Sequence, residues 1–396
     1  MADDDDLGVL DLGLLERSRS DHRDSGSPAE DHARDVSRRR LLALAGALAV
    51  AAGVAALQSR RSFTPVPQLA AEAVPIPART TRWQPSAPPP DVAVLDLRHP
   101  LLGGPRWDLF GLGETSVVRV ELATGRITQT RLGPMGNVDL SLIPVRRGVV
   151  VHRADYGPGY AVPDGGSARL TPPGLDGPGP MLPGPDLDHV WVQAGAGDAA
   201  RMVLTTSDGR PTPVSVALPT YPTFDPMPDG GGYPLFGAVG GFYRSVPGAR
   251  QRITTGVVIA AGAYGWLAVE CDDRDRCGTV LVDRHGRRRA VPGAADPRVP
   301  SGVLAPDGRT AAVYVMGAPA TLTVTLVDLV AGRRRAVGMA VGEGQGVRSL
   351  AWSPDSRWLF AVDASARLLV VDVRTARARR LVPELPGVRQ IALRAA

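Results

Sequence analysis

Side chains that could perform acid–base or metal chemistry are few in this 396-residue sequence. Histidine occurs at positions 22, 32, 99, 152, 189 and 285, and no two of these residues have the spacing of a zinc-binding helix motif. A Gly-x-Ser-x-Gly nucleophile elbow and a phosphate-binding glycine loop ahead of a helix are also absent from the sequence. We therefore predict no catalytic motif, no metal and no cofactor from the sequence.

The tightest acidic cluster in the C-terminal two thirds is Asp272, Asp273 and Asp275, with Arg274 between them. Calcium takes six to eight oxygen ligands, and an intervening arginine opposes such a site. We interpret the cluster as the solvated tip of a hairpin.

The sequence contains two cysteines, Cys271 and Cys277, which flank this acidic cluster. They end two apolar runs, YGWLAVEC and CGTVLVD, that have the composition of strands. Residues that face each other across a hairpin have β-carbons within disulfide range. We predict a disulfide that contributes about 2 kcal/mol by loop-closure entropy, with two free thiols as the alternative.

Arginine supplies every one of the 45 basic side chains, and the formal net charge is +5. Three arginine groups follow similar turns: Arg287, Arg288 and Arg289; Arg333, Arg334 and Arg335; Arg377, Arg379 and Arg380. Charge on an outer strand prevents edge-to-edge aggregation, and the same charge could form a stripe that binds an anionic polymer or a lipid surface. Neither a stacking aromatic platform nor the spacing of a DNA-binding motif accompanies the arginines, so we expect no nucleic-acid partner.

A turn recurs every 38 to 46 residues, and short Val- and Leu-rich runs flank it. Its central residues are Gly125, Gly166, Gly209, Gly248, Gly286, Gly332 and Ala376. Units of this length with several strands each are typical of β-propellers, in which stacked blades cover one another's faces. We predict an all-β fold with a seven-bladed propeller over residues 92–396, and six or eight blades remain open. His99, His152 and His189 fall in different units and could meet only at the central channel.

Two units carry a Pro-Asp-Gly-Arg type of turn between two strands. The residues are Pro306, Asp307 and Gly308 in one unit, and Pro354, Asp355 and Ser356 in the other. Proline presets φ, aspartate can accept a bond from its own backbone two residues on, and glycine tolerates a positive φ. The pattern resembles WD-repeat-like and TolB-like β-propellers.

The lack of lysine and the single asparagine are typical of a GC-rich, actinobacterial sequence. The dipeptide Trp107-Asp108 is not placed at the end of a third strand, so we give it no weight.

The C-terminal segment 387–394 repeats the pattern Gly-Val-Arg that precedes an innermost strand 41 residues earlier. We predict that this segment supplies the innermost strand of the first blade and closes the ring. The segment Val92–Leu97 also reads as a strand, and we place it in the linker or at a neighbouring edge.

The pattern of residues in the N-terminal region predicts that the rest of the chain is exported. Residues 41–57, LLALAGALAVAAGVAAL, are uncharged, and Arg38, Arg39 and Arg40 precede them. The positive-inside rule places the N-terminus in the cytoplasm and the propeller outside. We predict a disordered acidic cytoplasmic tail (1–36), a transmembrane helix or uncleaved export signal (37–61) and a proline-rich linker (62–91). Cleavage and secretion after twin-arginine-type export is the alternative.

These expectations point to a single-pass cell-membrane protein whose propeller binds a protein or an anionic envelope ligand. The fold commonly presents interaction surfaces, which is an argument by analogy. Two alternatives stay open. One is a channel-site enzyme of the glycosidase or lyase type, with carboxylates from separate blades. The other is a transmembrane regulator that signals through its cytoplasmic tail.

Overall fold

The structure is a computed structural model of the whole chain, and the residues that it describes lie within one compact unit, 69–396. It describes residues 72–73, 92–97, 99–133, 135, 139–155, 157–195, 197–219, 222–292, 302–316, 322–341, 347–381, 385 and 387–395. The predicted tail (1–36), the predicted membrane segment with Arg38, Arg39 and Arg40 (37–61), and all of the predicted linker except 72–73 lie outside these residues. Among the described residues, no helix is both long enough and apolar enough to span a bilayer.

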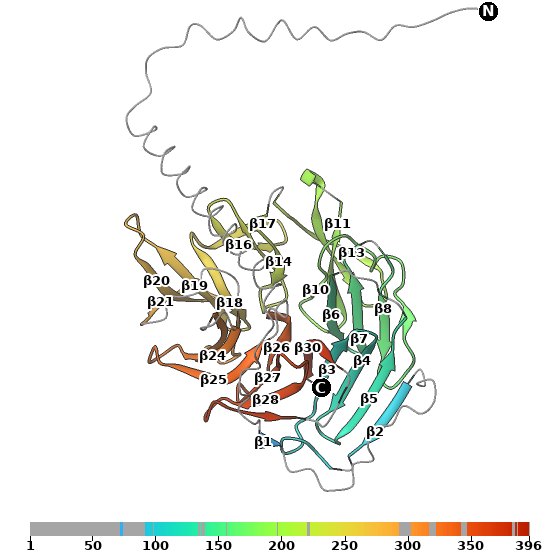
Figure 1. Cartoon of the computed structure of the whole chain (residues 1–396). Coiled ribbons are helices and arrows are strands. Elements are labelled where there is room, and N and C mark those ends of the chain that lie inside the picture. Colours follow the sequence, from blue (N-terminus) through green and yellow to red (C-terminus); the bar gives the residue numbers. More distant parts are fainter. Residues whose placement is uncertain are drawn as a thin grey trace, which may run out of the picture. The chain divides into compact units, whose positions relative to one another are not determined.

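The described residues form six β-sheets, in which most neighbouring strands follow one another in the chain and pair as antiparallel hairpins (Figure 1). Two pairs of strands are parallel. The first sheet contains, in spatial order, β2 (Val92–Asp96), β5 (Arg126–Arg131), β4 (Ser116–Glu121), β3 (Trp107–Gly113) and β30 (Val388–Ala395). The second contains β6 (Leu140–Val145), β7 (Gly148–Arg153), β8 (Tyr160–Pro163) and β9 (Arg169–Leu170). The third contains β10 (Leu182–Pro183), β11 (His189–Ala194), β12 (Arg201–Thr206) and β13 (Pro211–Ala217).

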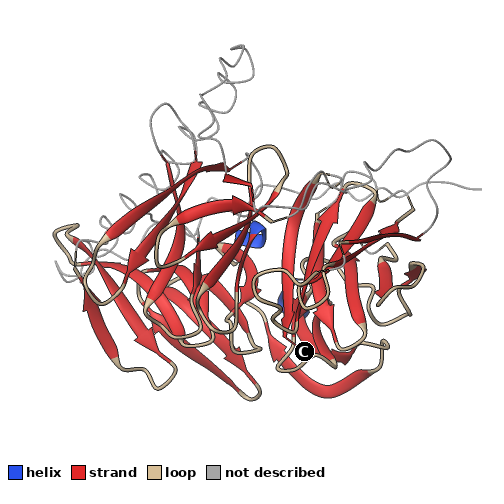
Figure 2. Ribbon diagram, turned by 90° about the horizontal axis from the view of Figure 1, so that it is seen from below, coloured by secondary structure: helices blue, strands red, loops and turns tan. Residues whose placement is uncertain are grey.

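The fourth sheet contains β14 (Phe224–Pro228), β15 (Pro234–Ala238), β16 (Gly241–Val246) and β17 (Ala249–Thr254). An eight-stranded sheet consists of two hairpin runs, each a set of four strands that follow one another in the chain and are paired in that order. They are β18 (Val257–Gly262), β19 (Gly265–Cys271), β20 (Cys277–Asp283) and β21 (Arg288–Val291), then β22 (Gly302–Leu304), β23 (Thr310–Met316), β24 (Leu322–Asp328) and β25 (Arg334–Val341). The last sheet contains β26 (Leu350–Trp352), β27 (Trp358–Val362), β28 (Leu368–Asp372), β29 (Arg377–Arg380) and β1 (Glu72–Ala73). Two 3-10 turns, η2 (Gly197–Ala199) and η3 (Val347–Ser349), complete the described elements (Figure 2).

This arrangement is an all-β propeller, as the spacing of the turns predicts. Each recurring turn joins the last two strands of a hairpin run, for example β4 to β5 at Gly125 and β28 to β29 at Ala376. Both central residues have a positive φ, 78° at Gly125 and 56° at Ala376, which is the left-handed backbone that such a turn requires. The alanine at the last turn therefore adopts a conformation that favours glycine.

The C-terminal strand joins the two ends of the described fold. β30 pairs antiparallel with β3, from Trp107 opposite Ala395 to Gly113 opposite Val388. This confirms that the C-terminal segment takes the innermost place of the first sheet. The competing segment, β2, pairs with β5 at the outer edge of the same sheet, so both segments fit because they occupy opposite edges.

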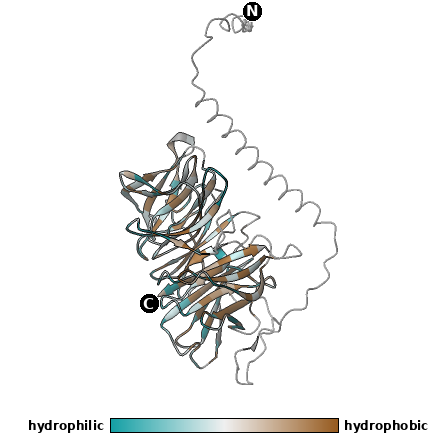
Figure 3. Ribbon diagram, turned by 90° about the vertical axis from the view of Figure 1, so that its left-hand side faces the viewer, coloured by the Kyte–Doolittle hydropathy of each residue, from teal (hydrophilic) through white to brown (hydrophobic). Residues whose placement is uncertain are grey.

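The core lies between successive sheets, because each sheet has two apolar faces that its neighbours must cover. Hydrophobic residues are frequent along the strands (Figure 3). Where the last sheet meets the first, Phe360 and Val370 pack in one cluster with Leu109 and Val118, and all four are almost fully buried. Burial of a side chain of this size contributes about 1.5–3 kcal/mol. Ring closure therefore rests on side-chain packing as well as on backbone pairing.

The two Pro-Asp turns adopt the predicted local geometry. Asp307 accepts a backbone bond from Arg309 at 2.9 Å, and Asp355 accepts one from Arg357 at 3.1 Å. Gly308 has φ +67°, and Ser356 has φ +58° at the equivalent position. The backbone N–H of Asp307 also donates to the hydroxyl of Ser356 at 3.0 Å, so this serine links two neighbouring turns.

Candidate functional site

A pocket of 570 Å³ lies between the second and third sheets. Its apolar floor includes Val145 at the end of β6, Val150 of β7 and Ala161 of β8, on the face of the second sheet that packs against the third. Residues from hairpin turns and strand ends form the polar rim, and they include Arg146, Arg147, Arg169, Asp188 and His189. The floor and the three arginines therefore belong to the second sheet, whereas Asp188 and His189 belong to the third sheet, which follows it in the chain.

One arginine of the rim is already paired across the pocket. Arg146 donates two hydrogen bonds to the carboxylate of Asp188, at 2.6 and 2.5 Å. The hydrogen bond from Arg146 lowers the pKa of Asp188 below its usual value. His189 follows Asp188 in the chain, and its Nδ1 lies 2.8 Å from the Asp186 carboxylate, which orients the ring.

The other two arginines of the rim are exposed. Within the described part of the chain, the side chains of Arg147 and Arg169 form no ion pair and no hydrogen bond. A guanidinium presents a fork of N–H donors that matches carboxylate, phosphate or sulfonate oxygens. The rim can therefore hold an anionic group above an apolar floor.

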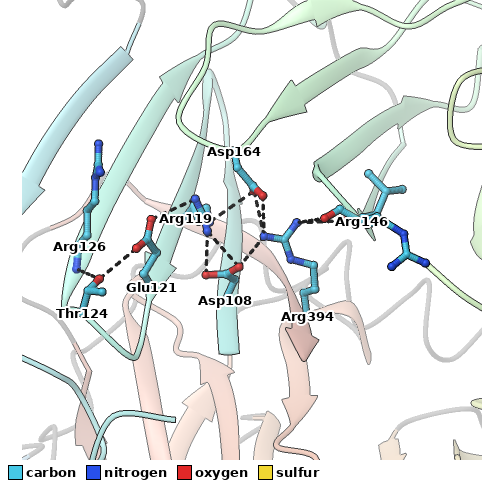
Figure 4. A network of polar contacts seen from close by, with 9 residues as sticks. Asp108, Arg119, Glu121, Thr124, Arg126, Arg146, Asp164 and Arg394 are labelled. Atoms are coloured by element: carbon cyan, nitrogen blue, oxygen red, sulfur yellow. Dashed lines mark hydrogen bonds and ion pairs between the residues drawn. The ribbon is translucent and has the colours of Figure 1, made fainter. Parts of the chain in front are cut away.

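A buried ion network lies beside this pocket and connects it to the C-terminal strand (Figure 4). The side chain of Arg394 in β30 is 6% exposed and contacts Asp108 at 2.5 Å and Asp164 at 2.9 Å. Arg119 of β4 contacts the same two carboxylates, at 3.1 and 3.4 Å, and Glu121 at 3.0 Å. Burial opposes the charge of Arg394, yet the hydrogen bonds that it donates to Asp108 and Asp164 outweigh this effect and raise the pKa of the guanidinium.

The network also fixes one side of the pocket. Arg394 donates to the backbone carbonyls of Val145 and Arg146, at 2.9 and 3.1 Å. These carbonyls belong to the turn between β6 and β7, which carries Arg146 and Arg147 on the pocket rim. The side chain of Arg394 therefore contributes both to ring closure by β30 and to the placement of the rim arginines.

The three histidines that could have met at a channel lie in separate places. His152 of β7 is buried, and its two ring nitrogens lie 3.1 Å from the carbonyl of Leu175 and 3.0 Å from that of Gly179. Burial lowers the pKa of His152, which favours its neutral form. Its role is to hold the connection between β9 and β10. No group of three His, Cys, Asp or Glu residues in the described ranges could hold a metal ion.

The buried carboxylates of the described residues serve hairpin turns. Asp229, between β14 and β15, is fully buried and contacts Arg244 at 2.8 Å and Arg284 at 2.5 Å. The guanidinium of Arg284 also lies 4.3 Å from the centre of the Trp266 ring. Asp283 and Asp363 each accept backbone bonds within their own turn and pair with an arginine four residues on.

The three predicted arginine groups lie on or just before β21, β25 and β29, the outer strands of their hairpin runs. Several of these arginines bind backbone carbonyls of the next sheet or hairpin run. Arg289 donates to Leu329 at 2.7 Å, and Arg335 donates to Arg374 at 2.6 Å and to Val373 at 2.7 Å. These arginines join neighbouring runs of strands, a role that the sequence analysis did not foresee.

The disulfide is present. Cys271 ends β19, Cys277 begins β20, and their sulfur atoms are bonded. The loop between them is a hairpin tip in which Asp272 accepts backbone bonds from Arg274 at 2.9 Å and from Arg276 at 3.0 Å. The acidic cluster therefore serves the turn, as predicted.

Sequence reasoning missed the pocket and the network. Arg147, Arg169 and His189 come from three turns or strand ends, and no motif connects them. Asp108 belongs to the Trp-Asp dipeptide that received no weight, yet it pairs with the C-terminal strand. The only signal for Arg394 was the repeat that predicted a strand there.

The chain was compared with known protein families, curated proteins and solved structures. No protein-family description and no curated protein matches the sequence. Solved structures with a similar arrangement include TolB from Acinetobacter baumannii (12% identity, 73% of this chain and 82% of that chain, TM-score 0.40). They also include YCF48 bound to D1 peptide (14%, 75% and 99%, TM-score 0.41) and oligogalacturonate lyase in complex with manganese (12%, 75% and 92%, TM-score 0.46). At such low identity the likeness concerns the fold alone. The classification of the described chain as a β-propeller rests on its own sheet topology.

Proposed function

We propose that this protein is a ligand-binding β-propeller whose pocket between the second and third sheets receives an anionic group attached to an apolar body. The observation that carries the proposal is the combination of two exposed arginines, Arg147 and Arg169, with a floor of valine and alanine in one pocket. The arginines supply charge-assisted hydrogen bonds, and the floor removes apolar surface from water. Pockets of this size, with a few polar groups around an apolar floor, are typical small-ligand sites.

The experiment uses 1-anilinonaphthalene-8-sulfonate, a fluorescent probe that joins a sulfonate to aromatic rings. We expect it to bind the full chain, and we expect the variant Arg147→Gln/Arg169→Gln to bind it at least about tenfold more weakly, since hydrogen bonds to charged groups are lost. The neutral analogue N-phenyl-1-naphthylamine should bind both proteins equally. Arg333→Gln, an exposed arginine of another sheet, is the matched control. Equal binding of the sulfonate by the double variant and the control would contradict the proposal.

We further propose that the propeller has seven blades, with each half of the eight-stranded sheet counted as one blade. The two halves pair only through the parallel strands β18 and β22, over two residue pairs, which is the contact of two innermost strands. The described residues also form seven apolar clusters, one between each consecutive pair of hairpin runs. Seven interfaces in a closed ring correspond to seven blades.

The cellular location is likewise a proposal. The uncharged run 41–57, preceded by Arg38, Arg39 and Arg40, supports a single-pass anchor with the propeller outside the membrane. An intact disulfide between Cys271 and Cys277 is consistent with an oxidising compartment. In that place the pocket would meet envelope components, so a protein or an anionic envelope ligand is the proposed partner.

A further inference from the structure

The outer edges of a propeller expose backbone groups that can pair with an additional strand. Two of these outer edges are paired with an additional strand. β2 adds to β5 over five residue pairs, and β1 adds parallel to β29, with Glu72 opposite Arg379. The outer strand of a sheet in this protein can therefore accept an extended segment.

Most of the remaining outer strands are irregular or short. β13, β17 and β25 each contain a register shift against the strand inside them, and β9 has two residues. Such irregularities twist an edge and prevent pairing. β21 differs, because it pairs with β20 without a shift from Val282 opposite Arg288 to Thr279 opposite Val291. The described residues place no strand outside it.

The register shows which backbone groups of β21 face outward. The N–H of Asp283 donates to the carbonyl of Arg287 at 3.0 Å, so this is a hydrogen-bonded pair. Bonded and non-bonded pairs alternate along an antiparallel ladder. Arg288 and Ala290 therefore direct their N–H and C=O groups away from β20, and both residues are exposed.

Arginine side chains hold this edge in place on both sides. Arg288 donates to the carbonyl of Ile253 at 3.1 Å and pairs with Glu270, whereas Arg289 reaches the carbonyl of Leu329 on the other side at 2.7 Å. An edge that is already ordered loses little conformational entropy when a partner binds. The exposed Arg252 of β17 and Arg334 of β25 add positive charge on the flanking outer strands.

We propose that the outer edge of β21 binds an extended acidic segment of a partner protein as an additional strand. Backbone bonds at Arg288 and Ala290 supply the pairing, and the surrounding arginines select acidic side chains. The backbone pairing of β1 with β29 is the precedent within this chain for a strand added at an outer edge. The site is distinct from the pocket between the second and third sheets.

The test is a titration of the full chain with a fluorescein-labelled peptide of alternating glutamate and valine, followed by fluorescence anisotropy. Ala290→Pro removes one outward N–H at an exposed edge position, where proline is tolerated. We expect this variant to bind the peptide about tenfold more weakly, because the facing carbonyl loses its donor. Ala290→Thr keeps the N–H and is the matched control, with affinity within about twofold of the wild type.

Hydrogen exchange supplies an independent measurement on the wild-type chain. The amides of Arg288 and Ala290 should exchange more slowly when the acidic peptide is present, and a lysine–valine peptide should not protect them. Absence of peptide binding would overturn the proposal. Equal affinity of Ala290→Pro and Ala290→Thr would also overturn it, because the contact would then depend on charge alone.

Discussion

At the scale of single residues, Arg394 joins three parts of the molecule. It contacts Asp108 within its own sheet, Asp164 of the second sheet, and the carbonyls of the β6–β7 turn. Removing one member of a buried ion pair leaves the other charge without its partner. Its partners Asp108 and Asp164 are partly exposed, 13% and 31%, which allows water to compensate in part.

Arg394→Met should therefore lower the free energy of unfolding by about 2–4 kcal/mol. Urea denaturation of the purified chain measures this change. Arg389→Met is the control, because its side chain is 69% exposed and 3.8 Å from Glu114, and it should change stability by less than about 0.5 kcal/mol. Similar losses in both variants would show that Arg394 does not hold the first two sheets together.

The buried phenol of Tyr314 should make the free energy of unfolding depend on pH in the alkaline range. Burial raises the pKa of this phenol to about 12, and its hydroxyl contacts Ser349. The folded pKa exceeds the unfolded value of about 10, so the contribution is complete below pH 10 and is lost as the pH rises toward 12. Relative to Tyr314→Phe, the wild type should lose about 2–3 kcal/mol over this interval. A constant difference between the two proteins from pH 9 to 12 would contradict this assignment.

At the scale of elements, much of the fold could be predicted from the sequence because local chemistry determines it. Glycine at positive φ marks the turns, proline and aspartate shape the β22–β23 and β26–β27 hairpins, and two cysteines close the β19–β20 hairpin. The pocket could not be predicted, because Arg147, Arg169 and His189 meet only after separate sheets pack. For the same reason, the arginines of β21 and β25 read as surface charge although they bind carbonyls of their neighbours.

Removal of the disulfide should have a modest effect on the free energy of unfolding. Cys271→Ser/Cys277→Ser should lower the free energy of unfolding by about 2 kcal/mol, since the loop that the bond closes is short. Chemical denaturation under non-reducing conditions measures the loss. Addition of a reductant should destabilise the wild type by the same amount and leave the double variant unchanged. An unchanged free energy of unfolding of the wild type on reduction would show that the bond does not stabilise the fold.

Removal of the closing strand β30 should have a larger effect on the free energy of unfolding. A chain that ends at Pro386 lacks β30, and with it the buried side chains of Val388 and Arg394 and the pairing with β3. We expect the transition midpoint to fall far below that of the full chain, by several kcal/mol of unfolding free energy. Stability equal to that of the full chain would show that β30 is dispensable for the fold.

At the scale of the whole molecule, the proposed topology places the propeller outside the membrane. A reporter that is active only outside the cytoplasm, fused after Ala396, should be active in cells. Replacing Arg38, Arg39 and Arg40 by glutamine should reduce that activity, because these charges set the orientation. A cytoplasm-only reporter that works at the same position would contradict the anchor and leave the pocket proposal intact.

The central claim is that the pocket between the second and third sheets binds an anionic, partly apolar ligand. A crystal structure of the chain with 1-anilinonaphthalene-8-sulfonate tests it most directly. We predict that the sulfonate lies within hydrogen-bond distance of Arg147 or Arg169 and that the rings pack on Val150 and Ala161. The probe bound only elsewhere, with this pocket empty or closed by side chains, would contradict the claim.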